Sequence, residues 1–191
     1  MPPRPFHYAL RAGTDICHVS RIRQVLARTD DPLSRLHKFT SKILTAPERA
    51  YFWHRFGPPA SISADLHGVS QYLAGRFAAK EAIRKACEQF DHSARGFQSI
   101  IILPITYTPH AKHQSVRPQG LVLDAPYVST PGKEGQKAYA EKAFPAYKLD
   151  DLEGQLCEVS ISHDGMWATA VALVPTMAAQ LHVDGSKPPQ G

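Results

Sequence analysis

The chain has 191 residues, and its 22 Lys and Arg against 17 Asp and Glu leave a formal net charge of +5 at pH 7. With 43% hydrophobic residues it has the composition of a globular protein that buries a core, and no apolar run approaches the roughly 20 residues that span a bilayer. The positive charge favours acidic or phosphate-bearing partners. Three cysteines, Cys17, Cys87 and Cys157, are odd in number and widely spaced. We therefore expect buried free thiols rather than a disulfide framework or a zinc site.

The N-terminal segment predicts a strand followed by a helix. Residues 6–12 alternate loosely and are expected to form the strand, so that Asp15 stands just after it, where the chain turns. Apolar residues then recur at helical spacing over residues 16–26. Arg21 and Arg28 lie two turns apart on one face of this helix, and from spacing alone they form a solvated basic face.

The next segment predicts two helices and a loop. Residues 36–44 favour a short helix or an irregular segment. Thr45 and Glu48 have the spacing of a capping box, so a helix is expected to begin there and to stop at Gly57. Residues 58–68 are expected to be a loop.

A long helix beginning near Val69 is expected to organise the fold. Small residues recur along it at every fourth position and form one stripe that allows a close approach to another backbone: Ala74, Ala78, Ala82 and Ala86. Ile83, Cys87 and Phe90 extend the buried face. Glu81 and Lys85, one turn apart, could form an ordinary ion pair on a solvated edge.

The remainder of the chain carries the strongest strand signals. Two strands and a modest helix are expected at residues 97–103, 120–123 and 133–144. Residues 157–162 alternate between apolar and polar side chains, and residues 166–174 run back as a second strand. His163, Asp164 and Gly165 between them are expected to make the turn of a β-hairpin.

Three polar side chains therefore stand at the ends of regular elements: Asp15, Glu81 and His163. Two carboxylates with water are a typical arrangement for Mg²⁺, which completes its coordination from substrate phosphates. Lys85, one turn beyond Glu81, could hold a phosphate as a point charge. Taken alone, this pattern supports metal-assisted phosphate chemistry and nothing more specific.

Three ordered motifs resemble those of the holo-acyl-carrier-protein synthase type of 4′-phosphopantetheinyl transferase. They are the stretches Gly13-Thr14-Asp15-Ile16, Gly75-Arg76-Phe77-Ala78-Ala79-Lys80-Glu81-Ala82 with Lys85, and Val159-Ser160-Ile161-Ser162-His163. The similarity covers most of residues 8–174, and the chain is identified as a fungal mitochondrial member of the family. The resemblance implies an α+β fold in which a small antiparallel sheet packs against a long central helix. It also implies a homotrimer with active sites at subunit junctions.

The implied reaction is Mg²⁺-dependent transfer of 4′-phosphopantetheine from coenzyme A to a serine of apo acyl carrier protein, with release of adenosine 3′,5′-bisphosphate. The resemblance gives each matching residue a role. Asp15 and Glu81 would hold Mg²⁺ and act in catalysis with Lys85 and His163. Coenzyme A would contact Arg76, Lys80, Lys85, Ser162 and His163, and Arg21 and Arg28 would dock the carrier protein. The serine needs a base, for which His163, a metal-bound water or an acidic residue would serve.

The chain departs from the bacterial pattern in two places. The stretch Cys87-Glu88-Gln89-Phe90-Asp91-His92 replaces a Gly-Thr-Gly loop that would contact the nucleotide. Exposed insertions are expected near residues 104–118 and 144–155, within one transferase domain over residues 1–175 and before a flexible tail over residues 176–191.

Two other classes of function fit parts of the pattern. One is another Mg²⁺-dependent phosphoryl transferase or hydrolase that acts on a nucleotide-type substrate with the same carboxylates. The other is a basic binding module without catalysis. Nucleic acid is disfavoured as a partner because the basic residues are scattered and no nucleic-acid motif is present. No membrane partner is expected, and mitochondrial localisation is favoured over cytoplasmic.

Overall fold

A computed structural model describes residues 9–27, 32–87, 90, 96–103, 118–128 and 152–176 of the chain. The helices are α1 Val19–Ala27, α2 Pro32–Ile43, α3 Ala46–Phe56, α4 Pro59–Ala64, α5 Leu66–Ala86 and the short 3₁₀ helix η2 Phe97–Ser99. The strands are β1 Leu10–His18, β2 Ile100–Leu103, β3 Gln119–Leu123, β4 Gly154–Asp164 and β5 Trp167–Pro175. The helix expected at residues 133–144, most of both expected insertions, Arg28 and the tail beyond residue 176 lie outside the described residues.

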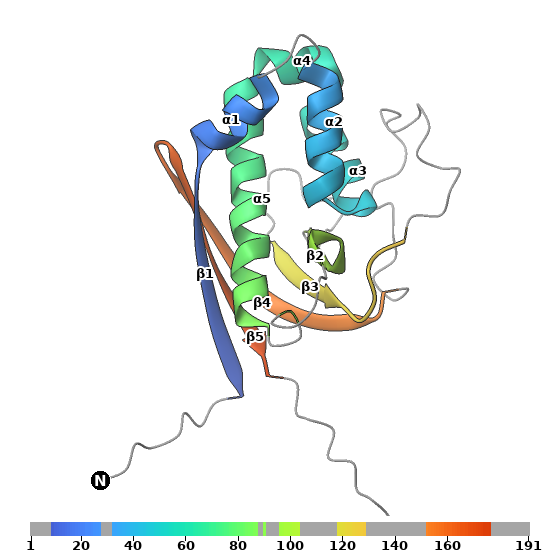
Figure 1. Ribbon diagram of the computed structural model, residues 1–191, viewed down its shortest axis with the longest axis vertical. Helices are drawn as coiled ribbons and strands as arrows, with labels where there is room; N and C mark the ends of the chain where they lie inside the picture. Colours follow the sequence, from blue (N-terminus) through green and yellow to red (C-terminus); the bar gives the residue numbers. More distant parts are fainter. Residues whose placement is uncertain are drawn as a thin grey trace, which may run out of the picture.

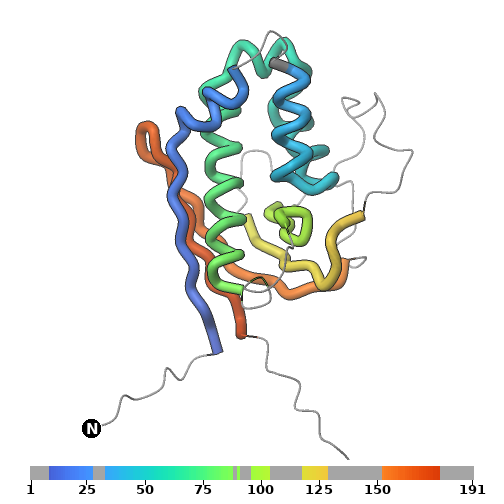
Figure 2. Tube along the Cα trace, in the orientation of Figure 1, coloured from blue at the N-terminus to red at the C-terminus, as the bar shows by residue number. Residues whose placement is uncertain are grey.

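The described strands form one antiparallel sheet in the order β1-β5-β4-β3-β2. The first and last strands of the described chain are neighbours along their whole length, from Leu10 opposite Pro175 to His18 opposite Trp167. Figure 2 shows this pairing as the blue strand running beside the red one. The expected α+β fold is confirmed, with the long helix α5 lying along the sheet and α1 to α4 gathered at one end (Figure 1).

Helix α5 lies close to the sheet because its contact stripe consists of small residues. Ala74, Ala78 and Ala82 have no exposed surface, as the fourfold spacing predicted. On the strand side, Gly13 of β1 is required: a Cβ atom there would lie 2.0 Å from the carbonyl oxygen of Ala82. The sequence motif that contains Gly13 therefore serves helix–sheet packing as well as any chemistry nearby.

Strand β1 extends further than the sequence predicted. It runs to His18, so Asp15 lies inside the strand rather than after it, and α1 begins only at Val19. Ile16 is apolar and fits the helical spacing of the residues after it, so the sequence predicted it in the first turn of the helix. In the structure it lies in β1 with 58% of its surface exposed. Pairing with β5 across residues 167–175, a contact invisible in local spacing, decides the boundary.

Two other boundaries differ from the prediction. Residues 58–68 contain the short helix α4 and the first turn of α5, instead of a loop. The hairpin between β4 and β5 is confirmed, but its turn is at Gly165 and Met166, which leaves His163 within β4. Gly165 has φ +52°, a conformation that favours glycine.

The two faces of the sheet differ in what covers them. Alternate residues of β5, among them Ala168, Ala170 and Ala172, are buried against α5. The intervening side chains form an apolar open face in which six residues from β1, β4 and β5 are each 42–58% exposed: Leu10, Ile16, Leu156, Trp167, Val171 and Leu173. We call this set the open apolar face.

No helix in the described part of the chain has the length and apolarity needed to cross a bilayer.

Candidate active site

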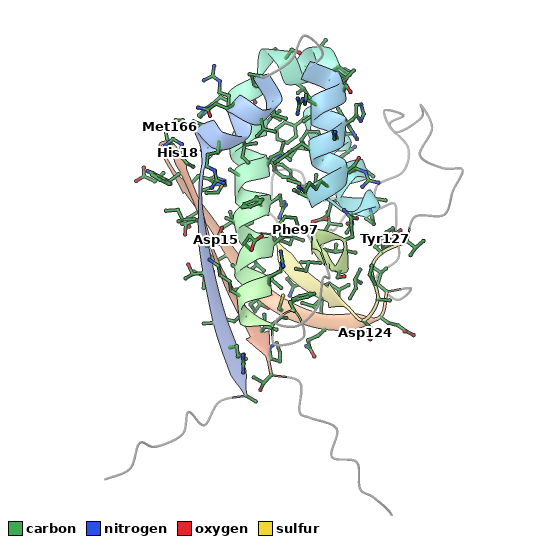
Figure 3. The ribbon with its side chains drawn as sticks, in the orientation of Figure 1. Asp15, His18, Phe97, Asp124, Tyr127 and Met166 are labelled. Carbon is green, nitrogen blue, oxygen red and sulfur yellow. The ribbon has the colours of Figure 1, made fainter. Side chains whose placement is uncertain are left out.

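The first and second sequence motifs meet at one edge of α5. Lys85 Nζ lies 2.7 Å from Asp15 Oδ1 and 3.1 Å from the backbone carbonyl of Thr14, although 70 residues separate Lys85 from Asp15. The Asp15 side chain is 15% exposed and that of Lys85 is 54% exposed, so the pair is accessible to a ligand. Figure 3 shows Asp15 beside α5 about midway along the helix.

Glu81 belongs to the same edge. It precedes Lys85 by four residues, so the two side chains are neighbours on one face of α5. Glu81 and Lys85 do not form the ion pair that their spacing allows. Lys85 forms an ion pair with Asp15, and Glu81 Oε1 lies 3.5 Å from Arg84 Nη1. Both carboxylates are therefore already associated with cationic side chains. We call Asp15, Glu81 and Lys85 the carboxylate face.

The carboxylate face fits a hard divalent cation. Asp15 accepts an ammonium group at contact distance, which shows that a cation can occupy this position beside the carboxylate. Two carboxylates suffice for Mg²⁺ because the ion retains waters and takes phosphate oxygens from its substrate. The described residues hold no cluster of three or more His, Cys, Asp or Glu, so no all-protein cage for a softer metal is present among them.

A cavity of about 180 Å³ lies on the other side of α5, between that helix, α3 and β4. Its lining includes Tyr51, Arg55, Tyr72, Gly75, Arg76, Pro118, Ile161 and His163. Among the described residues the lining holds two arginines and no acidic side chain, so their contribution to the cavity is positive. Its volume is below the roughly 300–1,000 Å³ of sites that enclose a whole drug-sized ligand. The cavity therefore suits one group of a larger ligand.

Arg76 is a buried cation with unused hydrogen-bonding capacity. The residue is 7% exposed, and Nε and Nη1 have no hydrogen-bond partner among the described residues. Its guanidinium carbon lies 4.9 Å from the centroid of the Tyr72 ring, and the buried Tyr72 hydroxyl is also without a partner in that set. Burial raises the pKa of Tyr72, so this hydroxyl stays protonated. Orphaned buried donors of this kind are rare in proteins, and a bound water, ion or ligand group would satisfy them.

His163 projects into the same cavity from β4. Its Nε2 lies 3.1 Å from the backbone carbonyl of Gln71, and because a carbonyl only accepts, Nε2 carries the hydrogen. In a neutral imidazole, Nδ1 is then the nitrogen that can take a proton. Gly75 is required opposite the ring, since a Cβ atom there would lie 2.8 Å from His163 Nε2.

Lys80 has a structural position that the sequence did not predict. Its ammonium has no exposed surface and donates to Glu48 Oε2 at 2.6 Å and to the Phe97 carbonyl at 3.0 Å. Burial lowers the pKa of Lys80, and the Glu48 charge opposes that shift. The Lys80 ammonium is thus enclosed and paired within this protomer, and its expected contact with coenzyme A stays a prediction.

The comparisons with known proteins agree with the motifs. The profile of the ACPS, 4′-phosphopantetheinyl transferase superfamily, matches residues 11–115. The protein named 4′-phosphopantetheinyl transferase B, mitochondrial, from Aspergillus fumigatus is 32% identical over 177 residues, which cover 88% of this chain and 95% of that protein. A holo-[acyl-carrier-protein] synthase from Chlorobaculum parvum is 30% identical over 165 residues, 86% of this chain and 97% of its own.

The chain belongs to the 4′-phosphopantetheinyl transferase superfamily. It is thus an enzyme that transfers 4′-phosphopantetheinyl groups, and the resemblance seen in the three motifs is confirmed. The crystal structure of a holo-ACP synthase from Plasmodium yoelii is 23% identical, with a TM-score of 0.48, and covers 90% of this chain and 97% of that chain.

Within one protomer of this transferase, α5 separates the two clusters. Tyr72 and Glu81 are nine residues apart, as are Arg76 and Lys85, which is about two and a half turns at 3.6 residues per turn. Each pair therefore points to opposite faces of the helix. The structure pairs Asp15 with Lys85, which lies one helical turn from Glu81, and it places Arg76 and His163 at one cavity, but it does not join the two groups.

The remaining expected site residues of the transferase lie elsewhere. Ser162 is exposed and pairs with Thr169, and by strand alternation it belongs to the sheet face opposite His163, so the two do not share the cavity. Arg21 is exposed on α1. Arg21 is close enough to act electrostatically on Cys17. Burial raises the pKa of the Cys17 thiol, the positive charge of Arg21 lowers it, and the negative charge of Asp15 raises it. The basic face therefore begins near the carboxylate face.

Sequence reasoning missed the contribution of α3 to the cavity. Tyr51 and Arg55 line it, and Tyr72 supplies the ring on which Arg76 rests. The spacing of Tyr51 and Arg55, one helical turn, was the signal available in the sequence. That spacing shows a shared face but not what the face meets.

Proposed function

We propose that the chain is a Mg²⁺-dependent holo-[acyl-carrier-protein] synthase that uses coenzyme A as donor and releases adenosine 3′,5′-bisphosphate. The observation that carries this proposal is the contact between Asp15 and Lys85, which joins the first motif to the central helix beside Glu81. In this proposal the serine oxygen of the carrier protein attacks the phosphorus that bears the pantetheine arm. The bond from that phosphorus to the bisphosphate breaks, and the serine proton passes to a base.

Each residue has a defined task in this reaction. Asp15 and Glu81 would hold Mg²⁺, which when bound supplies positive charge against the pyrophosphate. Lys85, already poised with its ammonium at the carboxylate face, would contact the phosphate from which the leaving group departs. Arg76 and His163 would bind the coenzyme, and His163 Nδ1 is the nitrogen available as a base because Nε2 is engaged by Gln71.

The active site requires a second copy of the chain if both clusters act on one coenzyme. They face opposite sides of α5, so the carboxylate face of one protomer would meet the cavity of its neighbour. The open apolar face, with Ile16, Trp167 and Val171 about half exposed, is a surface that association would bury. We propose the homotrimer implied by the family, and light scattering tests it: a fully active monomer would contradict this arrangement.

Two further assignments belong to this proposal. Arg21, with Arg28 after it in the sequence, would dock the acidic surface of the carrier protein, so Arg21→Ala should raise the KM for the carrier more than that for coenzyme A. Equal effects on both KM values would argue against a docking role. Mitochondrial localisation is proposed because the Aspergillus fumigatus relative is named mitochondrial, and imaging of a tagged chain tests it.

The central experiment incubates the full chain with coenzyme A, Mg²⁺ and an apo carrier protein. The carrier should gain the mass of one 4′-phosphopantetheinyl group. Glu81→Gln should abolish that gain and weaken direct binding of Mn²⁺, because it removes a metal-binding charge at nearly constant volume. Glu153→Gln, at an exposed position before β4, is the matched control and should behave as wild type.

Two results would count against the proposal. Unchanged turnover in Glu81→Gln would mean that Glu81 is only the partner of Arg84. No mass gain with any competent carrier would favour another Mg²⁺-dependent phosphoryl transferase or hydrolase.

A further inference from the structure

The cavity contains a second arginine that no motif includes. Arg55 is exposed on α3, and its guanidinium carbon lies 5.5 Å from the centroid of the Tyr72 ring. Arg76, from α5, lies 4.9 Å from the same centroid. One aromatic ring thus positions two guanidinium groups from two helices at the lining of one cavity.

The charge of this arginine pair is not neutralised by the described residues. No carboxylate forms a salt bridge with Arg55 or Arg76 in that part of the chain, and none lines the cavity. Glu48 is the acid that acts on Arg76 electrostatically, but its two oxygens already accept from Lys80, Ile102 and Thr45. Glu48 is therefore committed elsewhere, and two cations remain beside one ring at the lining of one cavity.

The arrangement has the chemistry of a phosphate site. A guanidinium presents a rigid fork of N–H donors that matches phosphate oxygens, and stacking on a ring pre-organises that fork. Within the described part of the chain, two buried nitrogens of Arg76 and the buried hydroxyl of Tyr72 have no hydrogen-bond partner, so donors are available on the protein side. The cavity volume of about 180 Å³ suits a phosphate group rather than a whole nucleotide.

We propose that Arg55 and Arg76, held on Tyr72, clamp one phosphate group of the nucleotide substrate, and that Arg55 determines the specificity for that phosphate. This inference rests on the proposed function, since it assigns a further binding residue to the same transferase. The phosphate is either the 3′-phosphate on the ribose or a phosphate at the 5′ position, and the two sources are separable with simple nucleotides.

The test measures equilibrium binding of adenosine 3′,5′-bisphosphate and adenosine 5′-monophosphate to the full chain by calorimetry. Arg55→Gln should weaken bisphosphate binding about 10- to 100-fold, the effect of losing a charge-assisted hydrogen-bonded contact. Arg55→Lys should recover part of the affinity, since it retains the charge but loses the fork. Arg35→Gln, an exposed arginine on α2 that does not line the cavity, is the matched control.

The pattern across the two nucleotides identifies the phosphate. If Arg55→Gln weakens binding of the bisphosphate but not of the monophosphate, the clamp holds the 3′-phosphate. If it weakens both equally, the clamp holds the 5′-phosphate. Wild-type affinity for both nucleotides in Arg55→Gln, with an unchanged melting temperature, would overturn the proposal.

Failure of this inference is distinct from failure of the proposed function. The clamp alone would be refuted if the wild-type chain transfers phosphopantetheine and the Arg55→Gln variant matches it in nucleotide binding and in the KM for coenzyme A. A chain that binds the bisphosphate through Arg55 yet adds no mass to any carrier would refute the transfer reaction while the phosphate site stands.

Discussion

The buried pair of Glu48 and Lys80 yields a quantitative prediction about stability. Both side chains have no exposed surface, and they join α3 to α5 at a distance of 2.6 Å. The other carboxylate oxygen accepts from the Ile102 backbone N–H at 3.0 Å, on β2, the last strand in the sheet order. Glu48 thus ties two helices to an edge strand, in which a free N–H would otherwise remain unpaired.

Removing each partner should have unequal consequences. Glu48→Gln leaves the Lys80 ammonium buried without a counter-charge and turns an amide donor toward other donors, so we expect a loss of about 3–5 kcal/mol in the free energy of unfolding. Lys80→Met removes one of the hydrogen bonds to Glu48 but leaves those from Thr45 and Ile102, and the loss should be about 1–3 kcal/mol. The double substitution should cost less than the sum of the two.

Urea unfolding of the full chain, with Glu153→Gln as the exposed control, measures these differences. For a chain of this length, each kcal/mol corresponds to roughly 2–4 °C in melting temperature, so Glu48→Gln should melt roughly 6–20 °C lower. A loss below about 1 kcal/mol for Glu48→Gln, or a larger loss for Lys80→Met, would refute the reasoning. The first result would mean that water or another group compensates the buried ammonium, and the second that the Glu48 carboxylate is the costlier charge to leave unpaired.

Two further predictions concern the cavity and the buried thiols. Gly75→Ala should lower the rate of transfer roughly 10- to 100-fold in steady-state kinetics, because its Cβ would displace His163. Gly96→Ala is the control, since a Cβ there meets nothing within 4 Å and should leave the rate unchanged. Equal activities of the two variants would contradict the placement of His163. Burial raises the pKa of Cys157 from 9.0 to about 12, so between these values the folded chain binds more protons than the unfolded one. The free energy of unfolding should therefore fall as pH rises from about 9 toward 12 in urea titrations, and Cys157→Ala should reduce that slope. A slope identical in both proteins would contradict the shift.

Local patterns in the sequence determined most of the elements and the chemistry of the carboxylate face. The fourfold alanine stripe, the Thr45–Glu48 spacing and the Asp-Gly turn are short-range signals, and α5, α3 and the β4–β5 hairpin follow from them. Helical spacing places Glu81 one turn from Lys85, and the contact of β1 with α5 adds Asp15, while the metal-binding and catalytic roles of these residues stay predictions.

The tertiary structure decided what depends on contacts between distant segments. Only strand pairing with β5 shows that β1 continues through Asp15 and Ile16. Only the packing of α3 shows that Glu48 forms an ion pair with Lys80 and that the Arg55 guanidinium lies over the Tyr72 ring. The division of the site across α5 also needed coordinates. Residue spacing determines on which face of a helix each side chain lies. What packs against that face comes from segments tens of residues away, through burial and charge pairing that no local pattern encodes.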